Sequence, residues 1–240
     1  MLVGFIKKAA ICGALFILAV PAWAQRGQGL GRQGIQGNCL IDAVPKQELD
    51  ATEAAGLAYM REEEKLARDV YAKLYSRWGA RIFANISRSE QRHFDELKLL
   101  LDRYELADPA ADSPAGVFQN TDLQALYTDL IAQGDASPSA ALRVGARIED
   151  MDIHDLDNAL AATDNDDLRI VYQNLKWGSE NHMRAFVGRL QALGETYTAQ
   201  YISEAALTEI LSGTNEVSRG FGGRVPRLGQ AGQGNGWRFR

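Results

Sequence analysis

Two of the chain's three histidines stand where the residues of a helical core are expected, each close to acidic residues. His93 follows Glu90 in an E-x-x-H pair, and on a helical wheel both share a face with Phe83, Phe94 and Leu97. Burying a carboxylate beside an imidazole costs free energy unless a partner replaces the lost hydration. A metal ion is such a partner, so the pair predicts a metal site inside a helical protein.

Each residue of this kind also has an ordinary interpretation. A single E-x-x-H pair is usually solvated, because helices are rich in glutamate, and an inward histidine is usually hydrogen-bonded core. The run from Glu62 to Lys65 has the composition of a charged surface face, with Arg68 as an i,i+4 partner of Glu64. The metal prediction therefore depends on whether several such residues meet in the fold.

Helical signals extend from residue 50 to residue 213. Asp50 with Glu53 forms a capping box, and Ser137-Pro138 is a typical helix start. The predicted helices cover about residues 50–78, 81–104, 121–133, 137–162, 167–193 and 203–212. No alternating β pattern is present. The four long helices pair as two hairpins joined by a crossover over 105–120, which predicts an all-α, four-helix-bundle fold.

In an antiparallel hairpin, residues equally far from the turn lie level with each other. The sequence therefore predicts which candidate ligands on the two helices of each hairpin lie at the same height. Glu64 and His93 have their midpoint at 78.5, at the turn between the first two long helices. Glu149 and His182 have theirs at 165.5, inside the turn between the last two. Each hairpin therefore brings one glutamate level with one histidine, and all four positions lie on apolar helix faces.

Four segments resemble a ferritin-like bacterial and archaeal family of uncharacterised role, known as domain of unknown function 2202. They are LAYMREEEKLARDVY (57–71), IFANISRSEQRH (82–93), EDMDIHDL (149–156) and GSENHMRAF (178–186). The resemblance spans about residues 51–212. It implies a ferritin-like bundle with a metal site, and it supplies no reaction.

The wider ferritin-like pattern has glutamates on the first and third helices and E-x-x-H on the second and fourth. This chain departs from it at Ser179, three residues before His182. Asp152 and Ser179 also have their midpoint at 165.5, so we infer that Asp152 replaces the missing carboxylate. His154 points to another face, and Asp155 is either exposed or a supporting group. The predicted ligands are Glu64, Glu90, His93, Glu149, Asp152 and His182.

Four carboxylates and two imidazoles suit two divalent ions of iron or manganese, and they also accept zinc. An iron pair would make oxidation with dioxygen or peroxide the natural reaction. Tyr71, on the face of Glu64, is either a hydroxyl beside the site or a hydrogen-bonded core tyrosine. Two alternatives remain open: a metal that only stabilises the bundle, and a metal-free interaction module whose buried acids pair with arginines, namely Arg68, Arg92 or Arg184.

The first 24 residues predict a cleavable signal peptide. Lys7 and Lys8 precede an apolar stretch over 9–20, and Ala22-Trp23-Ala24 is a small-x-small cleavage site. The apolar stretch is too short to span a bilayer comfortably, and no other membrane segment follows. We therefore expect a periplasmic or secreted protein cleaved after Ala24. Cys39 is the one cysteine left, which excludes an internal disulfide and thiolate metal cages.

Charge is unevenly distributed along the chain. Without residues 1–24, 24 Lys and Arg face 31 Asp and Glu, a net charge of −7. Residues 33–218 hold all 31 acids and 17 Lys and Arg, a net charge of −14. An acidic domain argues against nucleic acid as a partner. A Gly/Gln-rich linker over 25–49 precedes the domain, and a Gly/Arg-rich tail over 214–240 follows it. The glycine-rich stretch 25–38 and the tail are predicted to be disordered, and the oligomeric state stays open.

Overall fold

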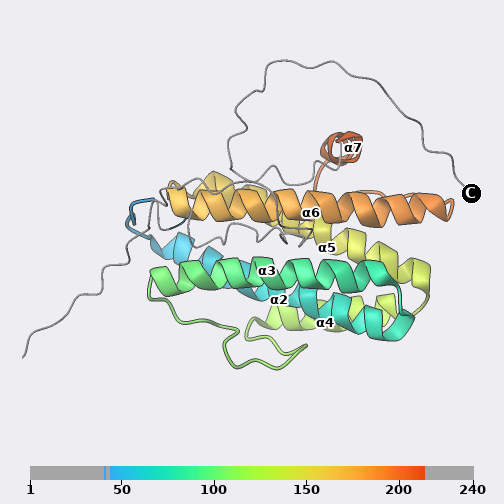
Figure 1. Cartoon of the computed structure of the whole chain (residues 1–240), viewed down its shortest axis with the longest axis horizontal. Coiled ribbons are helices and arrows are strands. Elements are labelled where there is room, and N and C mark those ends of the chain that lie inside the picture. Colours follow the sequence, from blue (N-terminus) through green and yellow to red (C-terminus); the bar gives the residue numbers. More distant parts are fainter. Residues whose placement is uncertain (1–40, 42–43, 214–240) are drawn as a thin grey trace, which may run out of the picture. The chain divides into compact units, whose positions relative to one another are not determined.

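The computed structural model describes residue 41 and residues 44–213, which form six helices and no strand (Figure 1). The predicted signal peptide (1–24), most of the linker (25–49) and the tail (214–240) lie outside the described residues. The helices are α2 (Ala51–Trp78), α3 (Arg81–Arg103), α4 (Thr121–Gly134), α5 (Pro138–Ala162), α6 (Asp166–Ala192) and α7 (Glu204–Ser212). The all-helical prediction is thus confirmed for this part of the chain.

The helix ends follow the local chemistry of the sequence. Asp50 accepts hydrogen bonds from the first backbone N–H groups of α2. The Glu53 carboxylate accepts one from the Asp50 backbone N–H, which completes a capping box. Gly79 ends α2 with φ 67°, a left-handed conformation that favours glycine. Ser137 caps α5, whose first residue is Pro138. These caps fix where each hairpin turns, and therefore which residues become level across it.

The long helices form two hairpins that pack on each other. α2 packs on α3 and α5 packs on α6, while α3–α6 and α2–α5 contacts join the two hairpins. Figure 1 shows α3 and α6 side by side, and α4 covers α2 and α5. α7 packs on α6. Among the described helices, none combines the length with the apolar character that crossing a bilayer requires.

The apolar core is divided into two clusters along the helices. One contains Leu66 to Leu74 of α2 with Phe83 and Ile86 of α3. The other contains Leu57 and Met60 of α2 with Leu97 to Leu101 of α3. α5 and α6 also contribute to both clusters. Each long helix also carries buried polar residues near the junction of the two clusters. This polar layer holds the predicted site, with Glu64 on α2, Glu90 and His93 on α3, Glu149 and Asp152 on α5, and Ser179 and His182 on α6.

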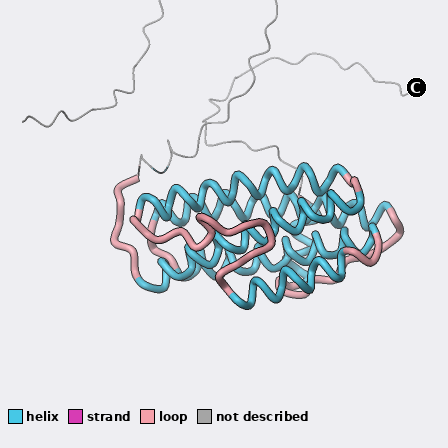
Figure 2. Tube along the Cα trace, turned by 90° about the horizontal axis from the view of Figure 1, so that it is seen from below, coloured by secondary structure: helices cyan, strands magenta, loops and turns pink. Residues whose placement is uncertain are grey.

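The crossover between α3 and α4 lies along the helices and is attached to α2 (Figure 2). Lys65 donates to the backbone carbonyls of Pro114 and Val117, and Glu62 accepts from the N–H groups of Gln119 and Asn120. The glutamate run is therefore not a surface face. All four side chains are buried: Glu62 and Lys65 because the crossover covers the side of α2 that would otherwise meet solvent, and Glu63 and Glu64 because they face the interior.

Candidate metal centre

Five of the six predicted ligands meet in the polar layer. α2 contributes Glu64, α3 contributes Glu90 and His93, α5 contributes Glu149, and α6 contributes His182. All five are buried. They form two groups of three that share Glu90, and in each group one potential ligand atom per residue lies within 4.8 Å of the others. Each group therefore has the composition and compactness of a metal site.

Glu90 stands at the middle of a nearly symmetric arrangement. Its Oε2 lies 2.8 Å from His93 Nδ1, and its Oε1 lies 2.8 Å from His182 Nδ1. On the outer sides, Glu64 Oε2 is 3.4 Å from His93 Nδ1, and Glu149 Oε2 is 3.4 Å from His182 Nδ1. The two imidazole rings stack with centroids 5.6 Å apart. Apart from the shared Glu90, each hairpin thus supplies one glutamate and one histidine, as the level heights require.

These close contacts are not ordinary hydrogen bonds. Nδ1 of His93, Nδ1 of His182, Glu64 Oε1 and Glu90 Oε1 are all buried without a hydrogen-bond partner. Buried polar atoms are normally paired, and orphaned ones call for a specific explanation. Lone pairs from four helices that converge without donors are what a bound cation would satisfy. The donor set, carboxylate oxygen with imidazole nitrogen, fits iron, manganese or zinc.

The metal-free alternative required arginines to neutralise these acids. Arg68 pairs with Asp69 instead, and Arg92 binds Ser89. Arg184 binds Asn181 and the Ile210 carbonyl. Within the described part of the chain, every ion pair of the three glutamates is made with a histidine, so no arginine or lysine compensates for their burial.

Burial and mutual charge separate the pKa values of the centre. Burial raises the pKa of Glu64 well above its usual range, and that of Glu149 less strongly. Burial acts in the same direction on Glu90, but His182 and His93 together outweigh it and lower the pKa of that carboxyl. Burial opposes the charge on His182, yet Glu90 and Glu149 raise its pKa to about 10. Without metal, His182 therefore keeps its proton at neutral pH.

Gly178 and Tyr71 contact residues of the centre and set their orientation. The Nε2 edge of His93 lies against Gly178, where an added Cβ would stand 2.5 Å from Nε2. This contact leaves Nδ1 to face the carboxylates. Tyr71, which is fully buried, donates its hydroxyl to Glu149 Oε1 and lies 3.3 Å from the Gly145 carbonyl. The structure therefore brings Tyr71 beside the centre, as a group that holds one of its glutamates.

Asp152 lies next to the five residues but outside both groups of three. Its Oδ2 is bonded to the hydroxyl of Ser179, so the two residues face each other across the hairpin. Its Oδ1 has no hydrogen-bond partner. Burial, then the charge of Glu149, raises the pKa of Asp152 to about 7. His154 is half-exposed beside Asn158 and takes no part in the centre.

Sequence reasoning missed Glu63, the neighbour of Glu64. Its side chain is 1 % exposed, and neither carboxylate oxygen has a hydrogen-bond partner. Burial raises its pKa well above the usual range, and the charges of Asp152 and Asp155 raise it further. The available signal was the width of the apolar arc on α2, which includes both glutamates.

Comparison with known proteins identifies relatives without a named activity. Residues 53–214 match the sequence model of a family described as "Uncharacterized protein domain (DUF2202)". The chain is 50% identical over 176 residues to "Uncharacterized protein MJ0754" of Methanocaldococcus jannaschii, covering 73% of this chain and 95% of that protein. A crystal structure of hypothetical protein MJ0754 superposes with a TM-score of 0.71 at 50% identity, covering 72% of this chain and 99% of that one.

Proposed function

This chain belongs to the DUF2202 family of uncharacterized proteins, and we propose that it is a ferritin-like four-helix-bundle protein whose buried centre binds two divalent metal ions. The observation that carries the proposal is the position of Glu90 between the Nδ1 atoms of His93 and His182, 2.8 Å from each. A carboxylate with one oxygen toward each of two histidines is suited to bridge two cations.

The residues divide between the two ions by hairpin. Glu64 and His93 would hold one ion, Glu149 and His182 would hold the other, and Glu90 belongs to both groups. Asp152 has a free Oδ1 and stands across from Ser179, so it supplies a further carboxylate in place of the one absent at that position. The positive charge of the ions offsets the burial cost of the acids, which no arginine or lysine offsets here.

Iron bound here supplies oxidation chemistry with dioxygen or peroxide, and we propose that the protein oxidises Fe(II). Two Fe(II) ions taken as substrate give up one electron each, and one hydrogen peroxide takes up both electrons and two protons to become two waters. Fe(II) is then its own reductant, which suits a chain without a cysteine-based electron-transfer module. The predicted signal peptide over residues 1–24 supports a site of action outside the cytoplasm.

The chain's own residues prepare the centre for this reaction. The two apolar clusters enclose the polar layer and limit its access to water. Gly178 gives His93 the space to present Nδ1, and Tyr71 fixes the position of Glu149 through its hydroxyl. Because the pKa of His182 is raised to about 10 in the metal-free state, binding of a cation at this histidine at neutral pH releases a proton.

The first test is elemental analysis of the protein purified by gel filtration and reconstituted with Fe(II), Mn(II) or Zn(II). We expect about two ions per chain, as in other two-metal bundle sites. His93→Ala and His182→Ala are each expected to lower the content by about one ion, since each removes a ligand of one position. His154→Ala is the matched control, because His154 lies outside the centre. Equal loss in all three variants would contradict the ligand assignment.

Two further measurements separate the alternatives. Asp152→Ala should reduce metal content selectively, whereas Ser179→Ala should have little effect, since only Asp152 is a proposed ligand. Fe(II) oxidation is then followed by absorbance with dioxygen or peroxide. Metal without turnover would identify a non-catalytic metal protein, and no metal after reconstitution would leave a helical interaction module.

A further inference from the structure

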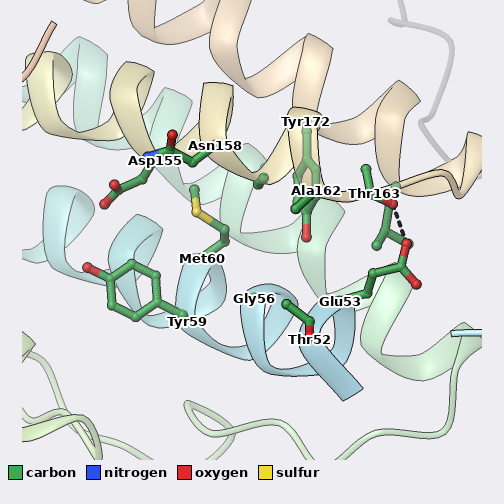
Figure 3. A pocket seen from close by; sticks show the side chains of 12 residues that line it. Thr52, Glu53, Gly56, Tyr59, Met60, Asp155, Asn158, Ala162, Thr163 and Tyr172 are labelled. Atoms are coloured by element: carbon green, nitrogen blue, oxygen red, sulfur yellow. Dashed lines mark hydrogen bonds between the residues drawn. The ribbon is translucent and has the colours of Figure 1, made fainter. Parts of the chain in front are cut away.

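A pocket lies beside the centre, between α2, α5 and α6. Its volume is about 330 Å³. Figure 3 shows Glu53 and Thr163 at one end, with Tyr59 and Asp155 toward the other. The latter end is the one nearer the centre, because Tyr59 is one helical turn from Glu63 on α2 and Asp155 is less than one turn from Asp152 on α5. The pocket therefore leads from the protein surface toward the polar layer.

Glu63 is buried one helical turn from Tyr59 of the pocket and next in sequence to Glu64 of the centre. Both of its carboxylate oxygens lack a donor, and the charges that act on it most strongly are three more acids, Asp152, Asp155 and Glu64. Asp155 is only partly buried and lines the pocket, so its carboxylate is accessible to ions in the pocket. A series of carboxylates thus connects the pocket to the centre.

No feature of the described fold uses the charge of Glu63. The adjacent Glu62 holds two backbone N–H groups of the crossover, whereas Glu63 holds none. A buried, unpaired carboxylate lowers the free energy of unfolding, so an isosteric neutral side chain would make a more stable protein. A cation that visits this position gives the charge a role. Carboxylate oxygens are hard ligands that bind Mn(II), Fe(II) and similar ions while the ions keep part of their water.

We propose that Glu63 and Asp155 form a transit site for divalent cations, which enter through the pocket and pass by Asp152 to the centre. This inference rests on the proposed function, because it concerns how the centre is filled. Two carboxylates without an imidazole bind more weakly than the centre does, so an ion that stops there moves on. Clefts lined by one sign of charge concentrate counter-ions and accelerate their binding.

The test is the rate at which the metal-free protein takes up Co(II), followed by its visible absorption in a stopped-flow instrument. Glu63→Gln keeps the size of the side chain and removes its charge. We expect uptake to slow by roughly 10-fold or more, the scale of electrostatic acceleration in charged clefts, with the final amount of Co(II) unchanged. Asp157→Asn, an exposed acid on the same helix as Asp155, is the matched control and should keep the wild-type rate.

A second pair of variants tests the pocket itself. Gly56 lines the pocket, and a Cβ added there meets no atom within 4 Å, so Gly56→Leu should fold and partly fill the space. Uptake of Co(II) should again slow while the final amount stays the same. Gly188→Leu is the control, because Gly188 is exposed on α6, has the same free space, and lies far along the helix from the pocket residues.

Each outcome decides between the proposals. Uptake by Glu63→Gln at the wild-type rate would overturn the transit site and leave the metal centre intact. A loss of bound Co(II) as large as in His93→Ala would make Glu63 a ligand of the centre, which also overturns transit. No Co(II) uptake by the wild-type protein would overturn both proposals. Thermal melting by circular dichroism verifies that each variant is folded.

Discussion

The two sides of α2 around residue 63 bury charge in opposite ways. On the side that faces the crossover, Glu62 is 3 % exposed and accepts hydrogen bonds from two backbone N–H groups, at 2.6 and 2.9 Å. On the interior side, Glu63 and Glu64 are 1 % and 2 % exposed, and both oxygens of Glu63 and one of Glu64 have no partner. Burial is the same on both sides, so it does not distinguish a structural acid from a functional one.

The difference lies in whether the charges are satisfied. The crossover side is complete: Lys65 bonds to Asp69 and two carbonyls, and Asp69 also accepts from Gly116 N–H. Such a network orders a segment that has little core of its own. On the interior side, within the described residues, His93 and His182 are the cationic partners of the three glutamates of the centre, and no arginine or lysine joins them. A satisfied network stabilises the metal-free fold, whereas an unsatisfied one lowers its stability and can be completed from outside.

The largest expected effect comes from breaking the crossover side. Lys65→Met removes the buried cation and leaves the carbonyls of Pro114 and Val117 without this donor, while Asp69 keeps only Arg68 and the Gly116 N–H as partners. We expect the free energy of unfolding to fall by about 3–5 kcal/mol, the usual cost of removing one member of a buried pair. Urea denaturation measures it. Lys73→Met, at an exposed position of the same helix, should change stability by less than about 0.5 kcal/mol.

A small effect of Lys65→Met would mean that the crossover is held by its apolar contacts alone. In that case the two sides of α2 would not differ in the way proposed, and the unsatisfied atoms of the interior would lose their diagnostic value.

The same comparison explains what the sequence could predict. Caps such as Asp50 and Ser137 and the 3.6-residue pattern located the helices closely, because these signals are local. Equal distance from the turns predicted which glutamate meets which histidine, since hairpin geometry needs only the position of the turn. Both depend on regular structure, and both agree with the six described helices.

The path of the crossover has no such periodicity, so its contacts could not be predicted. This is why Glu62 and Lys65 read as a surface face in the sequence and are buried in the structure. Glu63 was missed for a related reason: the wheel shows a direction, and whether a carboxylate finds a donor there depends on side chains from other helices. Equal heights predicted that Asp152 and Ser179 face each other across the hairpin. They did not predict that Asp152 lies outside the two groups of three.

The second prediction concerns pH, because the interior side raises the pKa values of its acids and the crossover side lowers them. Burial raises the pKa of interior Asp152 to about 7 from an ordinary 3.8. Between pH 4 and 7 the folded state therefore keeps a proton that the unfolded state has released, and stability falls as pH rises. His182, with its pKa raised to about 10 from 6.5, adds a loss between pH 6.5 and 10. Each retained proton corresponds to about 1.4 kcal/mol per pH unit.

On the crossover side the sign is reversed. Burial opposes the charge of Asp108, but its hydrogen bond with Arg61 outweighs this and lowers the pKa, so Asp108 stabilises the fold above its ordinary pKa and loses this effect on acidification. We expect urea denaturation of metal-free protein at successive pH values to show falling stability from pH 4 to 10. Asp152→Asn should flatten the part between pH 4 and 7, and Asp157→Asn should not. Rising stability across that range would contradict the unpaired state of the interior acids.

The smallest effect is the most direct comparison, because it concerns two glutamates separated by one residue. Glu62→Gln weakens two charge-assisted hydrogen bonds to the N–H groups of Gln119 and Asn120, so the free energy of unfolding should fall by about 1–2 kcal/mol. Glu64→Gln removes a carboxyl whose pKa burial raises well above its usual range. The metal-free protein should therefore become more stable by about 1 kcal/mol. Urea denaturation at neutral pH measures both variants.

Bound metal should reverse the order of stability of the two variants, so that Glu62→Gln becomes the more stable one. Since Glu64 is a proposed ligand and Glu62 is not, saturating Co(II) should stabilise Glu62→Gln as much as the wild type and Glu64→Gln much less. If both substitutions lowered stability equally without metal, Glu64 would be a structural acid like its neighbour. The proposal is supported if, without metal, Glu62→Gln lowers stability and Glu64→Gln raises it, and if only Glu64→Gln loses the stabilisation by Co(II). Glu62 would then serve the fold, and Glu64 would serve the ion.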